Sequence, residues 1–280
     1  MSGNKSESVP NGSRLAELIQ AGRPAIGLWT TLTDPGIANI FGAVGVDWLM
    51  VDTEHNPFTE ADVQGMVLAC RPWPMSCIVR VRGNDPAHIK WVLDTGADGV
   101  IIPMIRSQSE AECAVNAAKY HPVGRRGYSP LRATDFWASK KTYDATANER
   151  VLLICMIEQP EAVSEIDAIA RIPGIDGLFI GPEDLAHAMG HLQEPAHPDV
   201  KAAIDHVIET ANRHGKPWGI PTGDENVLAD YVRRGGTIMT FGSSSNLLTQ
   251  IATTRLATAR RILAPVSDAN APPHRSDHTG

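Results

Sequence analysis

The sequence has no apolar run that approaches the ~20 residues of a membrane span. Its first residues, MSGNKSESVPNGS, lack the apolar core of a signal peptide. It also has no basic excess, because 25 Lys and Arg stand against 32 Asp and Glu, for a net charge of −7. A nucleic-acid-binding protein would favour a basic face. We therefore expect a soluble, cytoplasmic protein with neither a membrane nor a nucleic acid as partner.

Two further motifs are missing. The four cysteines (Cys70, Cys77, Cys113 and Cys155) are scattered without a CxxC pair, and each lies in or beside an apolar segment. We expect buried free thiols rather than a disulfide framework. No GxGxxG follows a predicted strand, so a dinucleotide site has little support.

The hydrophobic pattern predicts an α/β protein. Short apolar strands alternate with amphipathic helices, which indicates a parallel sheet covered by helices. The expected strands are 25–30, 47–52, 77–82, 99–103, 151–157, 176–181, 217–220 and 237–241. The expected helices are 35–44, 59–70, 86–95, 107–120, 160–171, 199–214, 224–234 and 243–263. Eight such units predict a single-domain (β/α)8 TIM barrel over residues 12–264, between disordered tails at 1–11 and 265–280.

Barrel enzymes place their active sites at the C-terminal ends of the strands. Glu158 and Asp184 follow adjacent predicted strands, so their carboxylates can converge. Mg²⁺ and Mn²⁺ are often held by one or two carboxylates, with water and substrate as the other ligands. The alternative is that Asp184 caps a helix and Glu158 forms a salt bridge.

His55 follows the second strand in VDTEHNP, at the same rim. A neutral imidazole suits proton transfer near pH 7, although a lone histidine is more often structural. Arg80 or Arg82, one strand away, would suit a carboxylate or a developing enolate oxygen. The two arginines share a strand face, so their position does not choose between them.

No lysine lies at a predicted strand end, because Lys90 is in mid-helix and Lys216 precedes its strand. A Schiff-base aldolase needs such a lysine, so a metal must supply the electron sink. His187 and His191 have the i,i+4 spacing of a zinc site. We favour a structural interpretation of that pair, because Gly190 weakens the helix and no acidic base lies between the histidines.

Several segments together resemble the HpcH/HpaI family of metal-dependent 2-oxo acid aldolases. They are GLWTTLTDP, DWLMVDTEHNP, IVRVRGNDP, VLDTGADGVIIPM, HPVGRRG, MIEQPEAV and GLFIGPEDLA, and the resemblance covers roughly residues 13–262. It implies a divalent-metal-dependent aldolase (Mg²⁺, Mn²⁺ or Co²⁺) of aromatic or sugar-acid catabolism. Such an enzyme cleaves a 4-hydroxy-2-oxo acid to pyruvate, or a related 2-oxo acid, and an aldehyde through an enolate.

The resemblance also implies roles for individual residues. His55 is the general base or acid, Arg80 rather than Arg82 stabilises the enolate oxygen, and Asp94 raises the basicity of the histidine. Glu158 and Asp184 bind the metal, and the backbone at Glu183 holds the pyruvate carboxylate. The substrate-binding set is Trp29, Met156, Gly181, Pro182, Glu183 and Asp184.

Two positions depart from the family pattern. Met156 stands where a substrate-contacting Gln is usual, and Thr53 replaces the glycine of VDGEH. Met156 leaves room for an oxaloacetate decarboxylase or macrophomate synthase-like enzyme that uses the same enolate. A citrate-lyase-like enzyme acting on CoA thioesters, and a barrel that binds without turnover, are weaker alternatives.

Asp94 lies at the end of its predicted helix, ~12 Å below the rim at 1.5 Å per residue. It is therefore expected to approach a neighbouring subunit's His55 in a homo-oligomer, a trimer or hexamer, with Asp52 as the candidate within the chain. The stretch 121–149 is either an interface element or a solvated loop.

Overall fold

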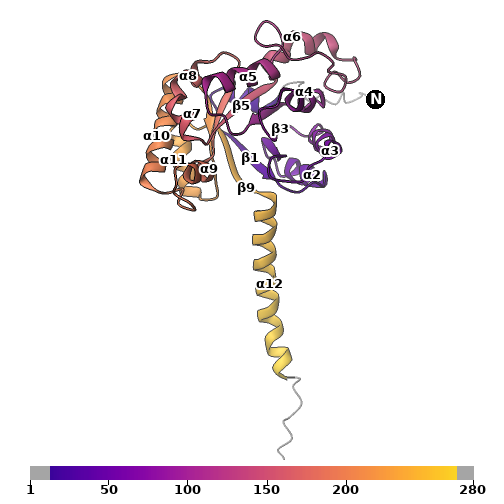
Figure 1. Ribbon diagram of the computed structural model, residues 1–280. Coiled ribbons are helices and arrows are strands. Elements are labelled where there is room, and N and C mark those ends of the chain that lie inside the picture. The colour runs from indigo at the N-terminus through magenta and orange to yellow at the C-terminus, as the bar shows by residue number, and fades with distance from the viewer. Residues whose placement is uncertain (1–12, 270–280) are drawn as a thin grey trace, which may run out of the picture.

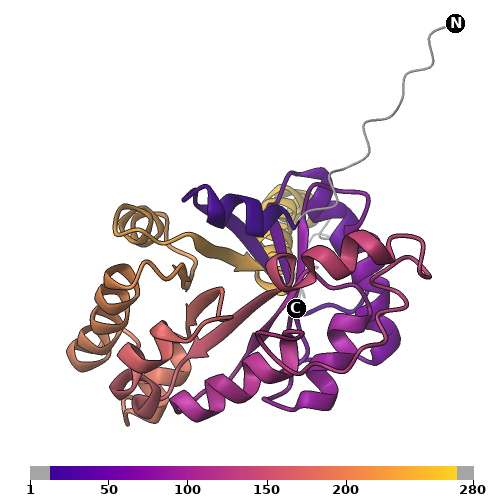
Figure 2. The same cartoon turned by 90° about the horizontal axis from the view of Figure 1, so that it is seen from above.

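The computed structural model describes residues 13–269, and its centre is a parallel barrel. Nine strands follow the order β7-β6-β5-β4-β3-β2-β1-β9-β8, and every paired neighbour is parallel. The strands are β1 Ala25–Thr30, β2 Trp48–Asp52, β3 Ser76–Arg80, β4 Gly99–Ile102, β5 Leu152–Ile157, β6 Gly177–Ile180, β7 Trp218–Gly219, β8 Pro221–Thr222 and β9 Ile238–Ser243. Helices surround the strands in Figure 2, which confirms the predicted fold class.

The helices return the chain between strands. They are α1 Arg14–Gln20, α2 Gly36–Ala43, α3 Glu60–Cys70, α4 Pro86–Asp94, α5 Gln108–Ala118, α6 Lys140–Arg150, α7 Pro160–Ser164, α8 Ile166–Arg171, α9 Pro182–Ala188, α10 Pro198–Arg213, α11 Glu225–Arg233 and α12 Ser244–Ala269. The sequence pattern misses α1, α6 and α9. It also joins α7 and α8, which the non-helical backbone of Glu165 separates.

The barrel closes at β7 and β8: the predicted strand 217–220 is shortened to β7, and β8 follows it as a second short strand. β7 pairs with β6, β8 pairs with β9, and the Thr237 N–H donates to the Trp218 carbonyl at 2.9 Å. Here Gly219 lies so close to β9 that an added Cβ would stand 1.7 Å from the Ile238 carbonyl oxygen. Only glycine allows this approach of two backbones.

Two apolar cores hold the barrel. The inner one fills the barrel and includes Trp48 and Phe179, whose rings meet edge to face at 6.2 Å. Leu15 and Leu18 of α1 join this inner core. The outer core lies between the strands and the helices. Because the strands are buried on both faces, almost every residue along them is apolar.

Helix α12 projects from the end of β9, away from the barrel (Figure 1). It continues to Ala269, beyond the predicted barrel boundary at residue 264. The rest of the predicted tails falls in residues 1–12 and 270–280, which lie outside the described residues. None of the described helices combines the length and apolar character needed to cross a membrane.

Two local expectations need correction. Cys113 is exposed on α5, although the other three cysteines are free and buried as predicted. The sequence also predicts an N-cap at Asp85, before Pro86, and a capping box between Ser107 and Glu110. The Asp85 cap of α4 is confirmed, and Ser107 caps α5 by accepting from the Glu110 N–H at 3.2 Å. The Glu110 carboxylate, however, accepts from the Arg106 N–H rather than completing a capping box with Ser107.

Candidate active site

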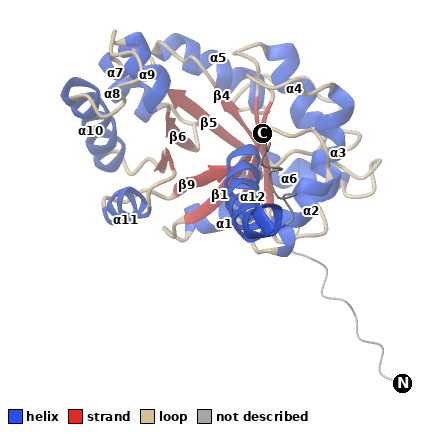
Figure 3. Cartoon of the chain, turned by 90° about the horizontal axis from the view of Figure 1, so that it is seen from below, coloured by secondary structure: helices blue, strands red, loops and turns tan. Residues whose placement is uncertain are grey.

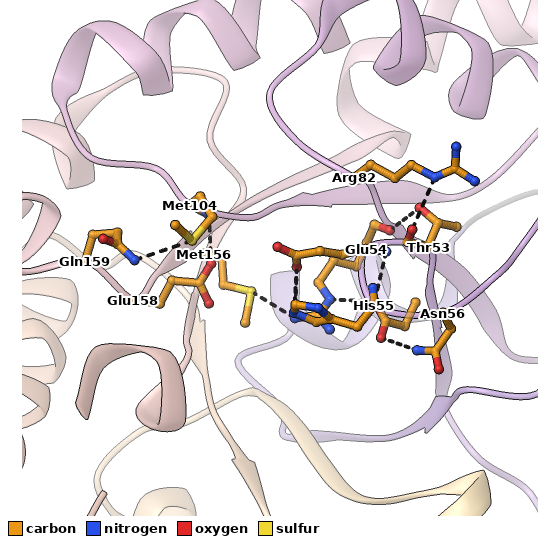
Figure 4. A network of polar contacts seen from close by, with 11 residues as sticks. Thr53, Glu54, His55, Asn56, Arg82, Met104, Met156, Glu158 and Gln159 are labelled. Atoms are coloured by element: carbon orange, nitrogen blue, oxygen red, sulfur yellow. Dashed lines mark hydrogen bonds and ion pairs between the residues drawn. The ribbon is translucent and has the colours of Figure 1, made fainter. Parts of the chain in front are cut away.

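The strand ends that carry the predicted polar residues lie at the face of the barrel from which α12 projects (Figure 3), and Figure 4 shows Glu54, His55 and Glu158 at close range. Asp52 of β2 is in register with Arg80 of β3, and Ile157 of β5 is in register with Ile180 of β6. Glu158 and the first turn of α9 therefore leave the sheet side by side. α12 begins at the same face, since it follows β9 directly.

Arg80 is a buried cation with a fixed orientation. Its Nε donates to Asp52 Oδ1 at 2.8 Å, and its Nη1 lies 3.2 Å from Glu54 Oε2. The guanidinium stacks over Trp29, with 4.4 Å from Cζ to the ring centroid. Nη1 also lies 3.9 Å from the Met156 sulfur. An aromatic face, two carboxylates and a sulfur thus hold one positive group beside the rim.

Arg82 has a different environment. It is exposed, and its Nη2 donates to the Phe58 carbonyl at 2.6 Å, so it fastens the loop after β2. The buried Thr53 of this loop, in the place of the family's glycine, donates its hydroxyl to the Arg80 carbonyl at 2.7 Å. Arg80 is therefore buried beside Glu54 and Met156, whereas Arg82 is exposed and bonds the loop after β2.

His55 lies at the mouth of the site with its side chain 61% exposed. Among the described residues, the Glu54 carboxylate lies within 4 Å of the ring, with Oε2 3.7 Å from His55 Nε2. Asp52 instead accepts from the Asn56 amide and the Glu54 backbone N–H, besides Arg80. Burial raises the pKa of Glu54; the Arg80 charge opposes this rise, whereas the charges of Asp52 and Asp184 add to it.

Glu158 carries the most unusual electrostatics of the site. It is 1% exposed, and its Oε1 accepts from the Met104 backbone N–H at 2.7 Å. Its Oε2 has no hydrogen-bond partner among the described residues. Burial raises its pKa to about 7, the Met104 hydrogen bond opposes this, and the charge of Asp184 adds to it. A cation at Oε2 would relieve the cost of burying this carboxylate.

Asp184 lies in the first turn of α9, which begins directly after Gly181. An added Cβ on Gly181 would stand 2.5 Å from Glu158 Oε2, so glycine is required for the turn to pass the carboxylate. The charge of Asp184 raises the pKa of Glu158, so the two carboxylates are close enough to form an oxygen donor set suited to a hard divalent cation. The residues present therefore fit the metal that the sequence predicts.

Met156 lies between the Glu158 group and the Glu54–His55 group (Figure 4). It is 2% exposed and turns its sulfur toward Arg80. Its thioether is a weak acceptor and has no donor, so this side of the site lacks the two N–H donors that a glutamine amide would offer.

Asp94 lies apart from these residues. Its Oδ1 accepts from Nη2 of the buried Arg126 at 2.5 Å, and among the described residues it makes no contact with His55. Burial raises the pKa of Asp94, and the hydrogen bond and charge of Arg126 oppose the rise. Arg126 belongs to the stretch 121–149, whose helix α6 lies at the end of the barrel opposite α12 (Figure 1).

The sequence pattern assigns no role to three residues that lie at the candidate site. Glu54 was visible in the VDTEH motif, but its contact with both Arg80 and His55 depends on rotamers. Met104 donates its backbone N–H to Glu158 from a left-handed conformation with φ 56°. No pattern of side chains in the sequence predicts that conformation. Gln159 lies beside it, with its amide nitrogen 3.4 Å from the Met104 sulfur.

Comparison with known proteins agrees with this arrangement. The model of the HpcH/HpaI aldolase/citrate lyase family matches residues 25–250. The chain belongs to this family. It is therefore grouped with carbon–carbon lyases, which confirms the predicted enzyme class.

Individual relatives cover most of the chain. It is 38% identical to a hydroxypyruvate/pyruvate aldolase of Pseudomonas aeruginosa, over 84% of this chain and 88% of that protein. It is 37% identical to a 4-hydroxy-2-oxo-heptane-1,7-dioate aldolase of Klebsiella pneumoniae, over 83% and 88%. A crystal structure of a family member from Burkholderia cenocepacia superposes with a TM-score of 0.84 at 32% identity, covering 89% of this chain and 99% of that one.

Proposed function

We propose that this family member is a divalent-metal-dependent aldolase that cleaves a 4-hydroxy-2-oxo acid to pyruvate, or a related 2-oxo acid, and an aldehyde. The observation that carries the proposal is Glu158, a buried carboxylate with one unpartnered oxygen beside Asp184. These two residues would hold Mg²⁺, Mn²⁺ or Co²⁺. When bound, the cation would polarise the substrate's keto group and serve as the electron sink.

The chain's own groups account for the other requirements of the reaction. His55 removes the proton of the 4-hydroxyl, the C3–C4 bond breaks, and the aldehyde leaves. The bonding electrons move onto the substrate's 2-oxo oxygen, where the Arg80 guanidinium stabilises the enolate. Protonation of C3 then gives the 2-oxo acid. Gly181, Pro182 and the backbone of Glu183 form the turn that would hold the substrate carboxylate.

The part of the site beside Arg80 is less polar, since Trp29 and Met156 flank the guanidinium and neither carries a charge. This favours small or apolar aldehydes. The same side of the site supports a second candidate, an oxaloacetate decarboxylase or macrophomate synthase-like activity through the same enolate. Oxaloacetate consumption without cleavage of any aldol would identify that candidate.

We also propose a homo-oligomer, a trimer or hexamer, working in the cytoplasm. Helix α12 exposes Leu248, Ile251, Leu256 and Ile262, each at least 52% accessible, along an element that leaves the barrel. Such an apolar surface on a projecting helix favours a second copy of the chain as its cover. In the oligomer Asp94 would approach a neighbour's His55.

Pyruvate release from a panel of 4-hydroxy-2-oxo acids, with and without chelator, tests the activity. We expect release to stop with a chelator and to return with Mg²⁺ or Mn²⁺. Glu158→Gln should abolish release, whereas Glu161→Gln, an exposed neighbour on α7, should leave it intact. Activity that survives complete metal removal, or borohydride trapping of a Schiff base, would overturn the mechanism.

Subunit complementation tests the role of Asp94. His55→Ala and Asp94→Asn subunits, each weakly active alone, would be unfolded, mixed and reassembled. If Asp94 acts on a neighbour, mixed oligomers regain activity, because a site can combine His55 from one subunit with Asp94 from another. Mixtures that form without regaining activity would exclude the cross-subunit role.

A further inference from the structure

The loop between α9 and α10 gathers two imidazoles and a carboxylate. The rings of His191 and His197 are stacked, with centroids 3.5 Å apart and planes inclined by 15°. Asp199 Oδ2 lies 3.5 Å from His191 Nε2 and 3.7 Å from His197 Nδ1. One potential ligand atom from each residue lies within 4.8 Å of the other two.

The backbone brings these residues together. The His191 N–H donates to the Ala186 carbonyl of α9 at 2.8 Å, which ties the loop to that helix. Two successive turns follow, closed by Glu194 N–H to His191 C=O at 3.0 Å and His197 N–H to Glu194 C=O at 2.9 Å. The two histidines therefore stand on adjacent turns, with Asp199 in the first turn of α10. Their side chains are 24% and 29% exposed, so solvent ions can reach them.

We propose that His191, His197 and Asp199 form a site for a divalent transition metal, with Zn²⁺ as the expected ion, separate from Glu158 and Asp184. Imidazole nitrogens favour zinc and its neighbours over Mg²⁺, which prefers oxygen ligands. Ligands ~2.1 Å from a tetrahedral Zn²⁺ are roughly 3.4 Å apart. The separations from Asp199 Oδ2 are close to that value. Three protein ligands leave one position for water.

Metal binding requires a small rearrangement. A metal lies in the plane of each imidazole that ligates it, so the stacked rings must rotate away from parallel. His197 Nδ1 must give up the 3.3 Å hydrogen bond that it accepts from the Asp199 N–H. The positive end of the α10 dipole opposes a cation there, and the Asp199 carboxylate offsets this. The bound ion would join the end of α9 to the start of α10.

This site differs from the i,i+4 pair in the sequence. α9 ends at Ala188, and Gly190 follows with φ 85°, so His191 leaves the helix on which His187 lies exposed. His187 is absent from the cluster. It is therefore a matched control, a histidine of the same segment that the proposed site does not use.

Zn²⁺ titration against a chromophoric chelator, in an excess of Mg²⁺, tests the proposal. If the proposed function is correct, excess Mg²⁺ would occupy the carboxylates at Glu158 and Asp184 without competing for imidazoles. We expect one Zn²⁺ per chain in the wild type and in His187→Ala. The double variant His191→Ala/His197→Ala should bind at least ~10-fold more weakly. Equal Zn²⁺ binding by all three proteins, or no binding by the wild type, would refute the site.

Limited proteolysis in the 189–197 loop gives a second measurement that does not depend on activity. Zn²⁺ should slow cleavage of this loop in the wild type and in His187→Ala, but not in the double variant. Protection that persists in the double variant would show that Zn²⁺ acts elsewhere and would contradict the proposal. Circular dichroism checks that each variant is folded.

Discussion

Asp52 and Arg80 form a buried ion pair across adjacent strands, with Arg80 Nε 2.8 Å from Asp52 Oδ1 and side chains 2% and 3% exposed. The two residues are direct register partners, so the sheet itself sets the pair. Removing Arg80 would leave the Asp52 carboxylate buried without its counter-charge. Within one chain Asp52 therefore orients the arginine, and its carboxylate is not the partner of the His55 ring.

Arg80→Lys should lower kcat by about 100-fold, in the range found when one oxyanion-stabilising donor is lost. Lysine keeps the charge but loses the planar fork that bonds Asp52 while stacking on Trp29. Steady-state kinetics of pyruvate release measure the change. Arg82→Lys is the matched control and should change kcat no more than a few-fold, because the hydrogen bonds of Arg82 among the described residues go to the backbone carbonyls of Thr53 and Phe58. Equal losses in both variants would contradict the assignment.

Met156→Gln should raise kcat/KM for substrates with a polar aldehyde half. The amide supplies two donors where the thioether offers a weak acceptor, and one net hydrogen bond of ~1 kcal/mol corresponds to roughly fivefold. Met156→Leu conserves volume without adding polarity and should leave the preference unchanged. The comparison needs kcat/KM for one polar and one apolar 4-hydroxy-2-oxo acid. An identical ratio in all three proteins would remove Met156 from substrate selection.

The sequence predicts the barrel well because most of its strands are apolar runs that alternate with amphipathic helices. It fails where structure depends on tertiary contact. The predicted strand 217–220 is shortened to β7 and followed by β8 because the ring must close past Ile238. α6 has few buried residues, so its sequence lacks the apolar stripe from which a helix could be predicted.

The same limit applies to the candidate site. Residues at strand ends could be placed at the rim from the order of the strands alone, as for Glu158 and Asp184. The hydrogen bond from the Met104 N–H to Glu158 could not be predicted, since it depends on the local backbone conformation. Asp94 remains the residue whose predicted role needs a second subunit, because its partner within the chain is Arg126.

Gly219→Ala should destabilise the fold by ~3 kcal/mol or more, because its Cβ would overlap the Ile238 backbone at the barrel seam. Urea unfolding measures the free energy of unfolding. Gly223→Ala is the matched control, since its Cβ would have nothing within 4 Å. A Gly219→Ala protein as stable as the control would show that β7 and β9 can separate without cost.

Asp98→Asn should change how stability depends on pH. Asp98 accepts from the Cys77 N–H at 2.8 Å and lines a cavity of about 230 Å³ with Arg71 and Arg150. Burial raises its pKa from 3.8 to about 6, against the opposing effects of the Cys77 hydrogen bond and the two arginines. A raised pKa in an acid means that the folded state holds the proton more tightly than the unfolded state. The favourable contribution of Asp98 is therefore fully present below pH 4 and is lost as pH rises to about 6.

Asparagine can still accept from Cys77 but does not ionise. The free energy of unfolding of the wild type should therefore fall relative to Asp98→Asn between pH 4 and pH 6 and then stay level. Urea unfolding of both proteins across that range isolates Asp98, because the other titrating groups are common to both and cancel in the difference. A difference that is constant with pH would mean that Asp98 titrates alike in the folded and unfolded states, so that its burial exerts no net effect.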